Sequence, residues 1–142
     1  MKSINWAEDY LALIKPRIIT LVVLVAVVTA IVAGAGDISF GRITMLALVG
    51  GMACAGSSLL NNYLDRDIDA IMERTRNRPL PRGRFASSKV LIIGLVLLIL
   101  SLLIGLRLNY LVALLLLSGA LVYVGLYTMW LKRRSSLNII IG

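Results

Sequence analysis

Residues 43–69 read ITMLALVGGMACAGSSLLNNYLDRDID, an apolar run that passes directly into an acidic cluster. The run at residues 43–60 carries no charge, and its length is near the roughly 17–25 residues that a helix needs to cross the hydrocarbon core of a bilayer. Three further apolar runs of this kind occupy residues 18–35, 90–106 and 110–131. The sequence therefore predicts an all-α fold, a polytopic transmembrane helical bundle with four spans.

The composition supports a membrane protein and excludes several other classes. Of the 142 residues, 59% are hydrophobic, which exceeds the roughly half-apolar makeup of soluble domains. The first apolar run is not expected to be a cleaved signal, because it is long and lacks a clear small-x-small cleavage site. Cys54 is the single cysteine and there is no histidine, so thiol and histidine metal sites and histidine acid–base chemistry are excluded.

The net charge of +8 is distributed in a way that favours a membrane orientation over nucleic-acid binding. If the N-terminus is cytoplasmic, all 15 basic residues except Arg42 and Arg107 fall on the cytoplasmic side, as the positive-inside rule requires. The first ten residues include Glu8 and Asp9 and are not rich in arginine, so they do not resemble a transit peptide. We therefore expect a multi-pass protein of a bacterial cytoplasmic membrane, in contact with lipid, with its N-terminus inside and no nucleic-acid partner.

The connections between the apolar runs differ greatly in length. A short turn at residues 34–42 and another around residues 107–109 predict two tight helical hairpins, and Pro16 is placed where the start of a helix tolerates proline. The long connection at residues 65–89 is rich in arginine and is interrupted by Pro79, Pro81 and Gly83. A loop of that length is usually functional or disordered, so we expect a cytoplasmic loop there.

Small residues recur along two of the predicted spans. They are Gly50, Gly51, Ala55 and Gly56 in the second span, and Gly94, Ser101 and Gly105 in the third. Such stripes usually permit close packing between membrane helices, and the alternative is room for a ligand against the backbone. The sequence thus indicates close contacts between spans, without deciding which spans meet.

The acidic cluster suggests binding of a hard cation. Asn61, Asp65 and Asp69 recur every four residues, so they share one face if the helix continues. Oxygen ligands of this kind suit Mg²⁺, which usually binds through one or two carboxylates together with substrate phosphates. The arginines that follow match phosphate oxygens in pairs. Acids and arginines beside a membrane therefore indicate a lipid diphosphate held through a bridging metal, although they could also form structural ion pairs with one another.

The same residues carry a family resemblance. Residues 61–69 resemble the first aspartate-rich motif of UbiA-type intramembrane prenyltransferases, N-D/N-x-x-D-x-x-x-D, and residues 74–81 (RTRNRPLP) match the R-T-x-N-R-P-L-P continuation of that family. Residues 15–17 (KPR) and 127–142 (YTMWLKRRSSLNIIIG) resemble the branch of the family that farnesylates haem. Together these stretches make the resemblance specific, and it covers nearly the whole chain.

The resemblance implies a transferase that moves a farnesyl group from farnesyl diphosphate to a vinyl group of haem B, giving haem O, with Mg²⁺ as cofactor. It implies Asn61, Asp65 and Asp69 as the metal ligands, of which Asp65 and Asp69 are catalytic. The residues expected to bind the diphosphate are Lys15, Asn61, Asn62, Arg74 and Arg78.

The resemblance also indicates that the chain is shorter than other members of the family. Members of the family form a ring of about nine spans and carry two aspartate-rich motifs, whereas four spans and one motif are present here. We therefore expect residues 1–142 to be the N-terminal part of a single transmembrane prenyltransferase domain, truncated before the ring closes. On this expectation the chain by itself cannot complete the metal site.

Other functions remain as alternatives. A prenyltransferase acting on an aromatic quinone precursor is the nearest one. A transporter or channel could use Asp65 and Asp69 for a cation, although such sites usually lie near the middle of a span. A non-catalytic membrane subunit could use the basic loop to bind anionic lipid or a partner. A CDP-alcohol phosphotransferase is disfavoured, because Ala70 follows Asp69 where that motif requires glycine.

Overall fold

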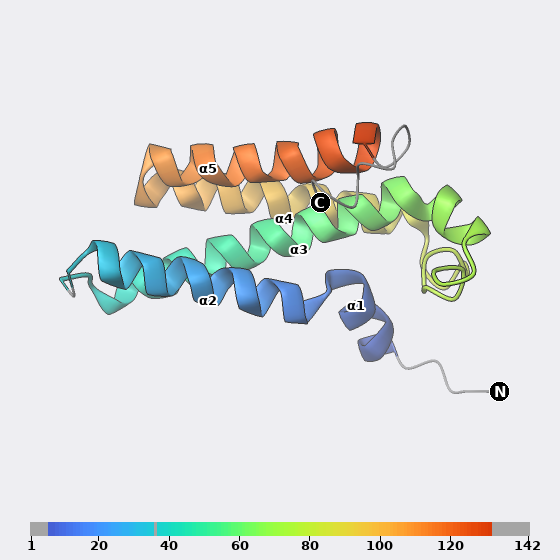
Figure 1. The fold of residues 1–142 in the computed structure, drawn as a ribbon, viewed down its shortest axis with the longest axis horizontal. Helices are drawn as coiled ribbons and strands as arrows, with labels where there is room; N and C mark the ends of the chain where they lie inside the picture. The colour runs from blue at the N-terminus through green and yellow to red at the C-terminus, as the bar shows by residue number, and fades with distance from the viewer. Residues whose placement is uncertain (1–5, 36, 132–142) are drawn as a thin grey trace.

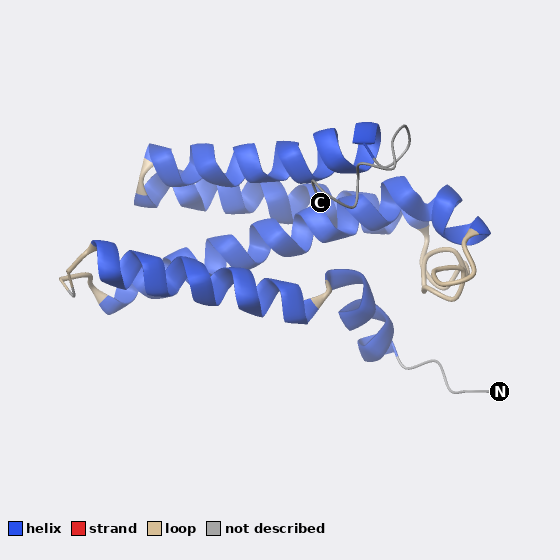
Figure 2. Cartoon of the chain, in the orientation of Figure 1, coloured by secondary structure: helices blue, strands red, loops and turns tan. Residues whose placement is uncertain are grey.

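The computed structural model describes residues 6–35 and 37–131, and its regular elements are all helical (Figure 2). Four segments in these ranges are long and apolar enough to cross a membrane: Pro16–Ala33, Phe40–Ile71, Ser87–Leu108 and Tyr110–Trp130. The prediction of an all-α bundle with four spans is confirmed. Most of the motif at residues 127–142, including Lys132, lies outside the described residues, as do residues 1–5.

The helices run in the order α1 (Trp6–Ile14), α2 (Pro16–Ala33), α3 (Phe40–Ile71), α4 (Ser87–Leu108) and α5 (Tyr110–Ala120), and α5 continues as the π-helical segment η1 (Leu121–Leu131). Helix α3 is central, because it contacts each of the other elements. Helices α4 and α5 lie side by side, while α2 lies along the other side of α3 (Figure 1). The short helix α1 and the loop that follows α3 lie at the same end of the bundle, which we call the loop end.

Residues at the helix boundaries explain where the spans begin. Helix α2 starts at Pro16, as predicted, because a proline at the first helical position loses no intrahelical hydrogen bond. The Ser39 side chain caps α3 by accepting a hydrogen bond from the Arg42 amide at 3.4 Å. Asn109 alone separates α4 from α5, and its side chain accepts from the Leu111 amide at 2.9 Å. These short connections confirm the two predicted hairpins.

The boundaries of the second span and of the long loop differ from the sequence prediction. The predicted span ended at residue 60 and the loop began at residue 65, whereas α3 continues to Ile71 and the loop comprises residues 72–86. The helix persists because Asp65 and Asp69 are buried against neighbouring elements and no proline lies between the start of α3 at Phe40 and Pro79. The whole acidic cluster is therefore helical, and the other predicted spans differ by only a few residues at their ends.

The small-residue stripes bring α3 and α4 into close contact. A Cβ atom built on Gly56 would lie 2.8 Å from the Gly94 carbonyl oxygen and 2.9 Å from the Leu98 amide nitrogen. A Cβ atom on Gly94 would lie 3.2 Å from the Gly56 carbonyl oxygen. The backbones of the two helices therefore meet at this pair of glycines, which confirms the packing interpretation for these two residues.

Gly56→Ala is expected to destabilise the bundle by about 1–3 kcal/mol, because the added methyl group meets backbone atoms that cannot move independently. Thermal unfolding in detergent measures the effect. Gly125→Ala is the matched control, since a Cβ atom there meets nothing within 4 Å and alanine is the better helix former. Equal unfolding temperatures for the two variants would contradict the close contact.

A small core fixes the loop end. The buried side chains of Leu13, Leu59, Leu80 and Val90 form one cluster that joins α1, α3, the loop and α4. The loop is also tied to α1 by Arg84, whose Nη1 lies 2.8 Å from each oxygen of Asp9. Helix α1 and residues 72–86 are therefore anchored to the same end of α3, where the acidic cluster lies.

Candidate functional site

A cavity of about 650 Å³ opens at the loop end, and we call it the polar cavity because charged and polar side chains contribute to its lining. Several residues predicted from the sequence line it, namely Lys15, Asn61, Arg74 and Arg78. The opposite wall comes from α5 and η1 and includes Leu115, Ser118, Gly119, Val122, Tyr123 and Tyr127. Residues far apart in the chain thus combine cationic groups, an amide and phenol hydroxyls around one space, a lining that suits an anionic ligand.

Asn61 is the centre of a hydrogen-bond network that joins α3 to Lys15 and η1. Its Oδ1 atom accepts from Lys15 Nζ at 3.1 Å. Its Nδ2 atom donates to Asp65 Oδ2 and to Thr128 Oγ1, both at 2.9 Å. Because both amide protons are used and the residue is buried, Asn61 is held in one orientation, with its carbonyl oxygen directed toward the lysine.

Asp69 lies one turn beyond Asp65 and is held by the loop. Its Oδ2 atom accepts from Arg78 Nη1 at 2.7 Å, and its backbone carbonyl accepts from Thr75 Oγ1 at 3.1 Å. Both aspartates are buried, whereas Asp67 is exposed. Asn61, Asp65 and Asp69 thus share one face of α3, as expected. This face is directed toward the basic groups.

Asn62 is placed differently from the sequence expectation. It is buried, but it does not line the polar cavity. Its Nδ2 atom donates to the Leu13 carbonyl at 2.9 Å and to the Ser58 carbonyl at 2.8 Å. The structure therefore does not bring Asn62 together with the other residues expected to bind a diphosphate, because its amide faces the end of α1.

Sequence reasoning did not identify the contribution of η1. Tyr123 belongs to none of the motifs identified in the sequence, yet its hydroxyl accepts from Lys15 Nζ at 3.4 Å, and its ring stacks on Tyr127 with centroids 6.0 Å apart. Thr128 is buried and donates to the Tyr123 carbonyl at 2.8 Å. The available signal was a pair of tyrosines and a threonine at the end of an apolar run, where a buried polar tip needs a partner.

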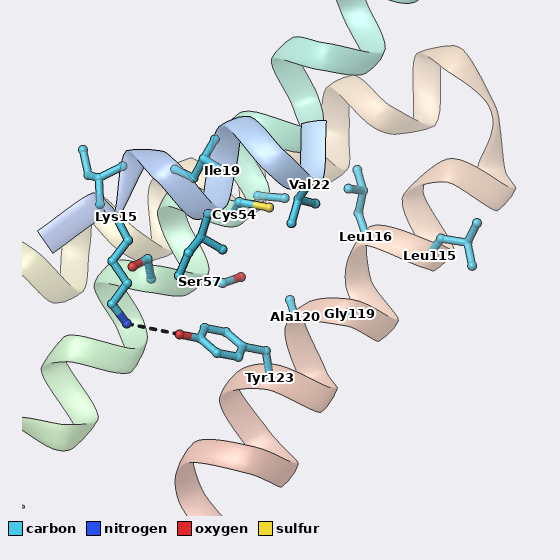
Figure 3. Close-up of a pocket in the computed structure, with 14 residues that line it drawn as sticks. Lys15, Ile19, Val22, Cys54, Ser57, Leu115, Leu116, Gly119, Ala120 and Tyr123 are labelled. Carbon is cyan, nitrogen blue, oxygen red and sulfur yellow. Dashed lines mark hydrogen bonds between the residues drawn. The ribbon is translucent and has the colours of Figure 1, made fainter. Parts of the chain in front are cut away.

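An apolar cavity of about 360 Å³ adjoins the polar one. The two share Lys15, Leu115, Gly119 and Tyr123, and Figure 3 shows Lys15 and Tyr123 pointing toward one another at this junction. Most of the remaining lining is aliphatic, from α2, α3 and α5, and includes Ile19, Val22 and Leu116 (Figure 3). The site can therefore accept a molecule with an anionic head and an apolar tail.

The residues of the acidic cluster fit a divalent ion in part. Oδ1 of Asp69 is buried and accepts no hydrogen bond from the described residues, so it has an acceptor position to offer. The parts of the chain described in the structure contain no group of three or more His, Cys, Asp or Glu side chains that could hold a metal alone. Two carboxylates and an amide oxygen suit Mg²⁺ when substrate phosphates supply further ligands.

The backbone conformation of Lys15 leads to a prediction about stability that does not depend on its ammonium group. Lys15 has φ 59° and ψ 62°, the left-handed conformation, which costs a residue with a Cβ atom roughly 1–2 kcal/mol. Lys15→Gly is therefore expected to be about 1 kcal/mol more stable than Lys15→Ala, although both variants lack the ammonium group. Thermal unfolding of the two variants side by side tests this difference, and an alanine variant at least as stable as the glycine variant would contradict it.

Comparison with known proteins gives a match to one family model and matches to curated relatives. A model of the UbiA prenyltransferase family matches residues 21–142. Protoheme IX farnesyltransferase of Symbiobacterium thermophilum is 44% identical over 143 residues, which cover 100% of this chain and 48% of that protein. The protein of the same name from Bartonella quintana is 43% identical over 138 residues, 94% of this chain and 43% of its own. The chain thus spans about half the length of the curated relatives it matches.

A solved structure supports the same architecture. A chain from a structural study of digeranylgeranylglyceryl phosphate synthase in membranes superposes with a TM-score of 0.81 at 24% identity. The match covers 89% of this chain and 44% of that chain. At this level of identity the likeness shows the fold alone.

Proposed function

The chain belongs to the UbiA prenyltransferase family, and we propose that the protein transfers a farnesyl group from farnesyl diphosphate to a vinyl group of haem B, giving haem O. Family membership together with four long apolar helices makes it a multi-pass membrane protein. The names of the relatives, which span twice this length, support haem as the acceptor. The alternative acceptor is an aromatic quinone precursor.

One observation carries the proposal of a prenyl diphosphate donor. The polar cavity, with Lys15, Arg74 and Arg78 in its lining, meets the apolar cavity at Lys15 and Tyr123. An isoprenoid diphosphate has the same division, with an anionic head joined to a hydrocarbon tail. The bond that breaks, between the first tail carbon and the diphosphate, would lie at this junction.

The residues of the chain perform distinct tasks in this proposal. Lys15, Arg74 and Arg78 bind the diphosphate, with the arginine forks matching phosphate oxygens in pairs. The aliphatic wall of α2 and α5 excludes water from the farnesyl fragment as positive charge develops on it. Asn61, kept in one orientation by Asp65 and Thr128, holds Lys15 at the junction. The π electrons of the acceptor vinyl group form the new carbon–carbon bond as the bond between the farnesyl carbon and diphosphate breaks. Water then adds to the carbocation left on the other vinyl carbon and releases a proton, which leaves a hydroxyl group on the product.

Asn61, Asp65 and Asp69 are the residues we propose as ligands of Mg²⁺. When bound, the ion would offset the negative charge that grows on the leaving diphosphate. The buried Oδ1 atom of Asp69 and the oxygen donor set support this assignment. In the structure described here Arg78 Nη1 donates to the other carboxylate oxygen of Asp69, Oδ2, while Lys15 Nζ donates to Asn61 Oδ1. The contact between Lys15 and Asn61 would therefore rearrange on loading.

We also propose the cellular location. The distribution of the basic residues supports an N-terminus on the inside of a bacterial cytoplasmic membrane. The loop end, with Arg74, Arg78 and Arg84, would then face the cytoplasm, where a water-soluble diphosphate head is accessible. Labelling of a cysteine introduced at Asn77, in the loop, by a membrane-impermeant reagent in intact cells and in inverted vesicles tests this orientation.

Mass spectrometry of haem from cells expressing the full-length protein tests the acceptor. Haem carrying a farnesyl substituent is expected in these cells and absent in cells carrying the empty vector. The matched measurement follows prenylated aromatic acids in the same extracts. Unmodified haem together with a prenylated aromatic acid would replace the haem proposal by the quinone alternative.

A further inference from the structure

Two buried side chains of α3 converge on one backbone carbonyl of α1. Ser58 Oγ donates to the Leu13 carbonyl at 2.8 Å, and Asn62 Nδ2 donates to the same oxygen at 2.9 Å. Ser58 and Asn62 lie one helical turn apart and both are buried, and Leu13 is fully buried. Both hydrogen bonds join α3 to a separate helix, so α3 does not depend on either of them for its own helical structure.

The Leu13 carbonyl is one of the groups that a helix cannot satisfy internally. It belongs to the last four carbonyls of α1, which have no partner within the helix. The chain then passes through Lys15 in the left-handed conformation and enters α2 at Pro16. With the carbonyl fixed before Lys15 and a helix fixed after it, the direction of the Lys15 side chain is set.

In this direction the Lys15 side chain extends into the candidate functional site. Lys15 Nζ reaches Asn61 Oδ1 at 3.1 Å and the Tyr123 hydroxyl at 3.4 Å, at the junction of the two cavities (Figure 3). Asn61 and Asn62 are therefore neighbours with separate tasks. Asn61 contacts the ammonium group, and Asn62 holds the backbone from which that side chain extends.

We infer that Asn62, together with Ser58, is a positioning residue that acts through the Leu13 carbonyl to hold the Lys15 ammonium at the diphosphate end of the site. This differs from the direct contact with diphosphate expected from the sequence. The consequence for substrate rests on the proposed function, whereas the effect on Lys15 does not. A primary amide suits the task, because its two N–H groups reach the Leu13 and Ser58 carbonyls at once.

The first experiment measures the position of Lys15 without any substrate. The purified protein is treated with an amine-acylating reagent, and the rate of Lys15 modification is followed by mass spectrometry. Asn62→Leu and the milder Ser58→Ala are each expected to raise that rate severalfold. Ser101→Ala is the matched control, since this buried serine of α4 donates only within its own helix, to the Leu98 carbonyl. An unchanged rate in folded Ser58→Ala and Asn62→Leu protein would overturn the inference.

The second experiment asks whether Asn62 acts through Lys15. Asn62→Leu is expected to raise the KM for farnesyl diphosphate about tenfold, the effect of weakening one hydrogen bond to a charged group. In a Lys15→Met background the same change should add less than about twofold, because two residues that act through one group are not additive. A full additional tenfold loss in that background would assign Asn62 a direct contact and overturn the inference. Absence of any farnesyl transfer by the unaltered full-length protein would count against the proposed function, and the acylation rates would still decide the role of Asn62.

Discussion

Asp65→Asn is expected to lower the rate of farnesyl transfer by about a hundredfold to a thousandfold, the usual loss when one preorganised electrostatic group is removed. Asp65 is completely buried and accepts from Asn61, which in turn holds Lys15. Asparagine keeps the shape of the side chain but removes its charge, so the proposed metal loses a ligand and the network loses its anion. Steady-state assays of the full-length protein with farnesyl diphosphate and haem measure the effect.

Asp67→Asn is the matched control for this change. Asp67 lies in the same turn of α3 but is exposed, and removal of its charge should leave the rate within about twofold, as for an ordinary surface substitution. Equal losses in the two variants would mean that the face of α3 has been assigned wrongly. Normal transfer in Asp65→Asn combined with an altered cation flux would instead favour the transporter alternative.

Arg78→Met is expected to destabilise the protein by about 2–3 kcal/mol and to weaken diphosphate binding. Asp69 is buried, and its Oδ2 atom lies 2.7 Å from Arg78 Nη1. Removing one partner of such a pair leaves an uncompensated buried charge, which is the main cause of the cost. Because Arg78 is itself partly exposed, the expected loss lies below the range for fully buried pairs. Thermal unfolding and farnesyl diphosphate titration measure the two effects.

The double variant Arg78→Met, Asp69→Asn separates stability from binding. Neutralising Asp69 removes the unpaired charge, so most of the lost stability should return. Diphosphate binding should not return, because the double variant still lacks the guanidinium group of Arg78 and the carboxylate of Asp69. Arg82→Met serves as the control on the same loop, since Arg82 is exposed and its guanidinium group donates to Asn77 Oδ1 and not to an aspartate. Recovery of binding in the double variant would show that Arg78 acts only on stability.

The fold was largely predictable because the physical signal was local. Each apolar run has the length that a membrane span needs. Pro16 marks the start of α2 because proline suits the first helical position, and Asn109 marks the start of α5 because its side chain caps that helix. The end of α3 was misplaced for a different reason. Continuation of the helix through Asp65 and Asp69 depends on burial against the loop and η1, which residues distant in sequence provide.

The candidate site was predictable only where the motif is contiguous. Spacing at every fourth residue placed Asn61, Asp65 and Asp69 on one face, and the side chains of Lys15, Arg74 and Arg78 do line the same cavity or contact these residues. Asn62 was grouped with them because it occupies the second position of the motif that residues 61–69 share with the family. Asn62 nevertheless points away from the cavity that Asn61 lines, since successive residues lie about 100° apart around the helix axis.

By itself, the sequence determined the helical spans, the acidic face of α3 and the family, because spacing along one helix and the chemistry of each side chain are fixed by the chain. Only the tertiary structure decided that Tyr123 and Thr128 join the site, that Asn62 faces α1, and that the polar and apolar cavities meet at Lys15. The physical reason is that these relations arise where α1, α3 and η1 pack together. Packing of this kind brings together residues that are far apart in the sequence. The residues next to each of them in the chain do not indicate which distant residue it will contact.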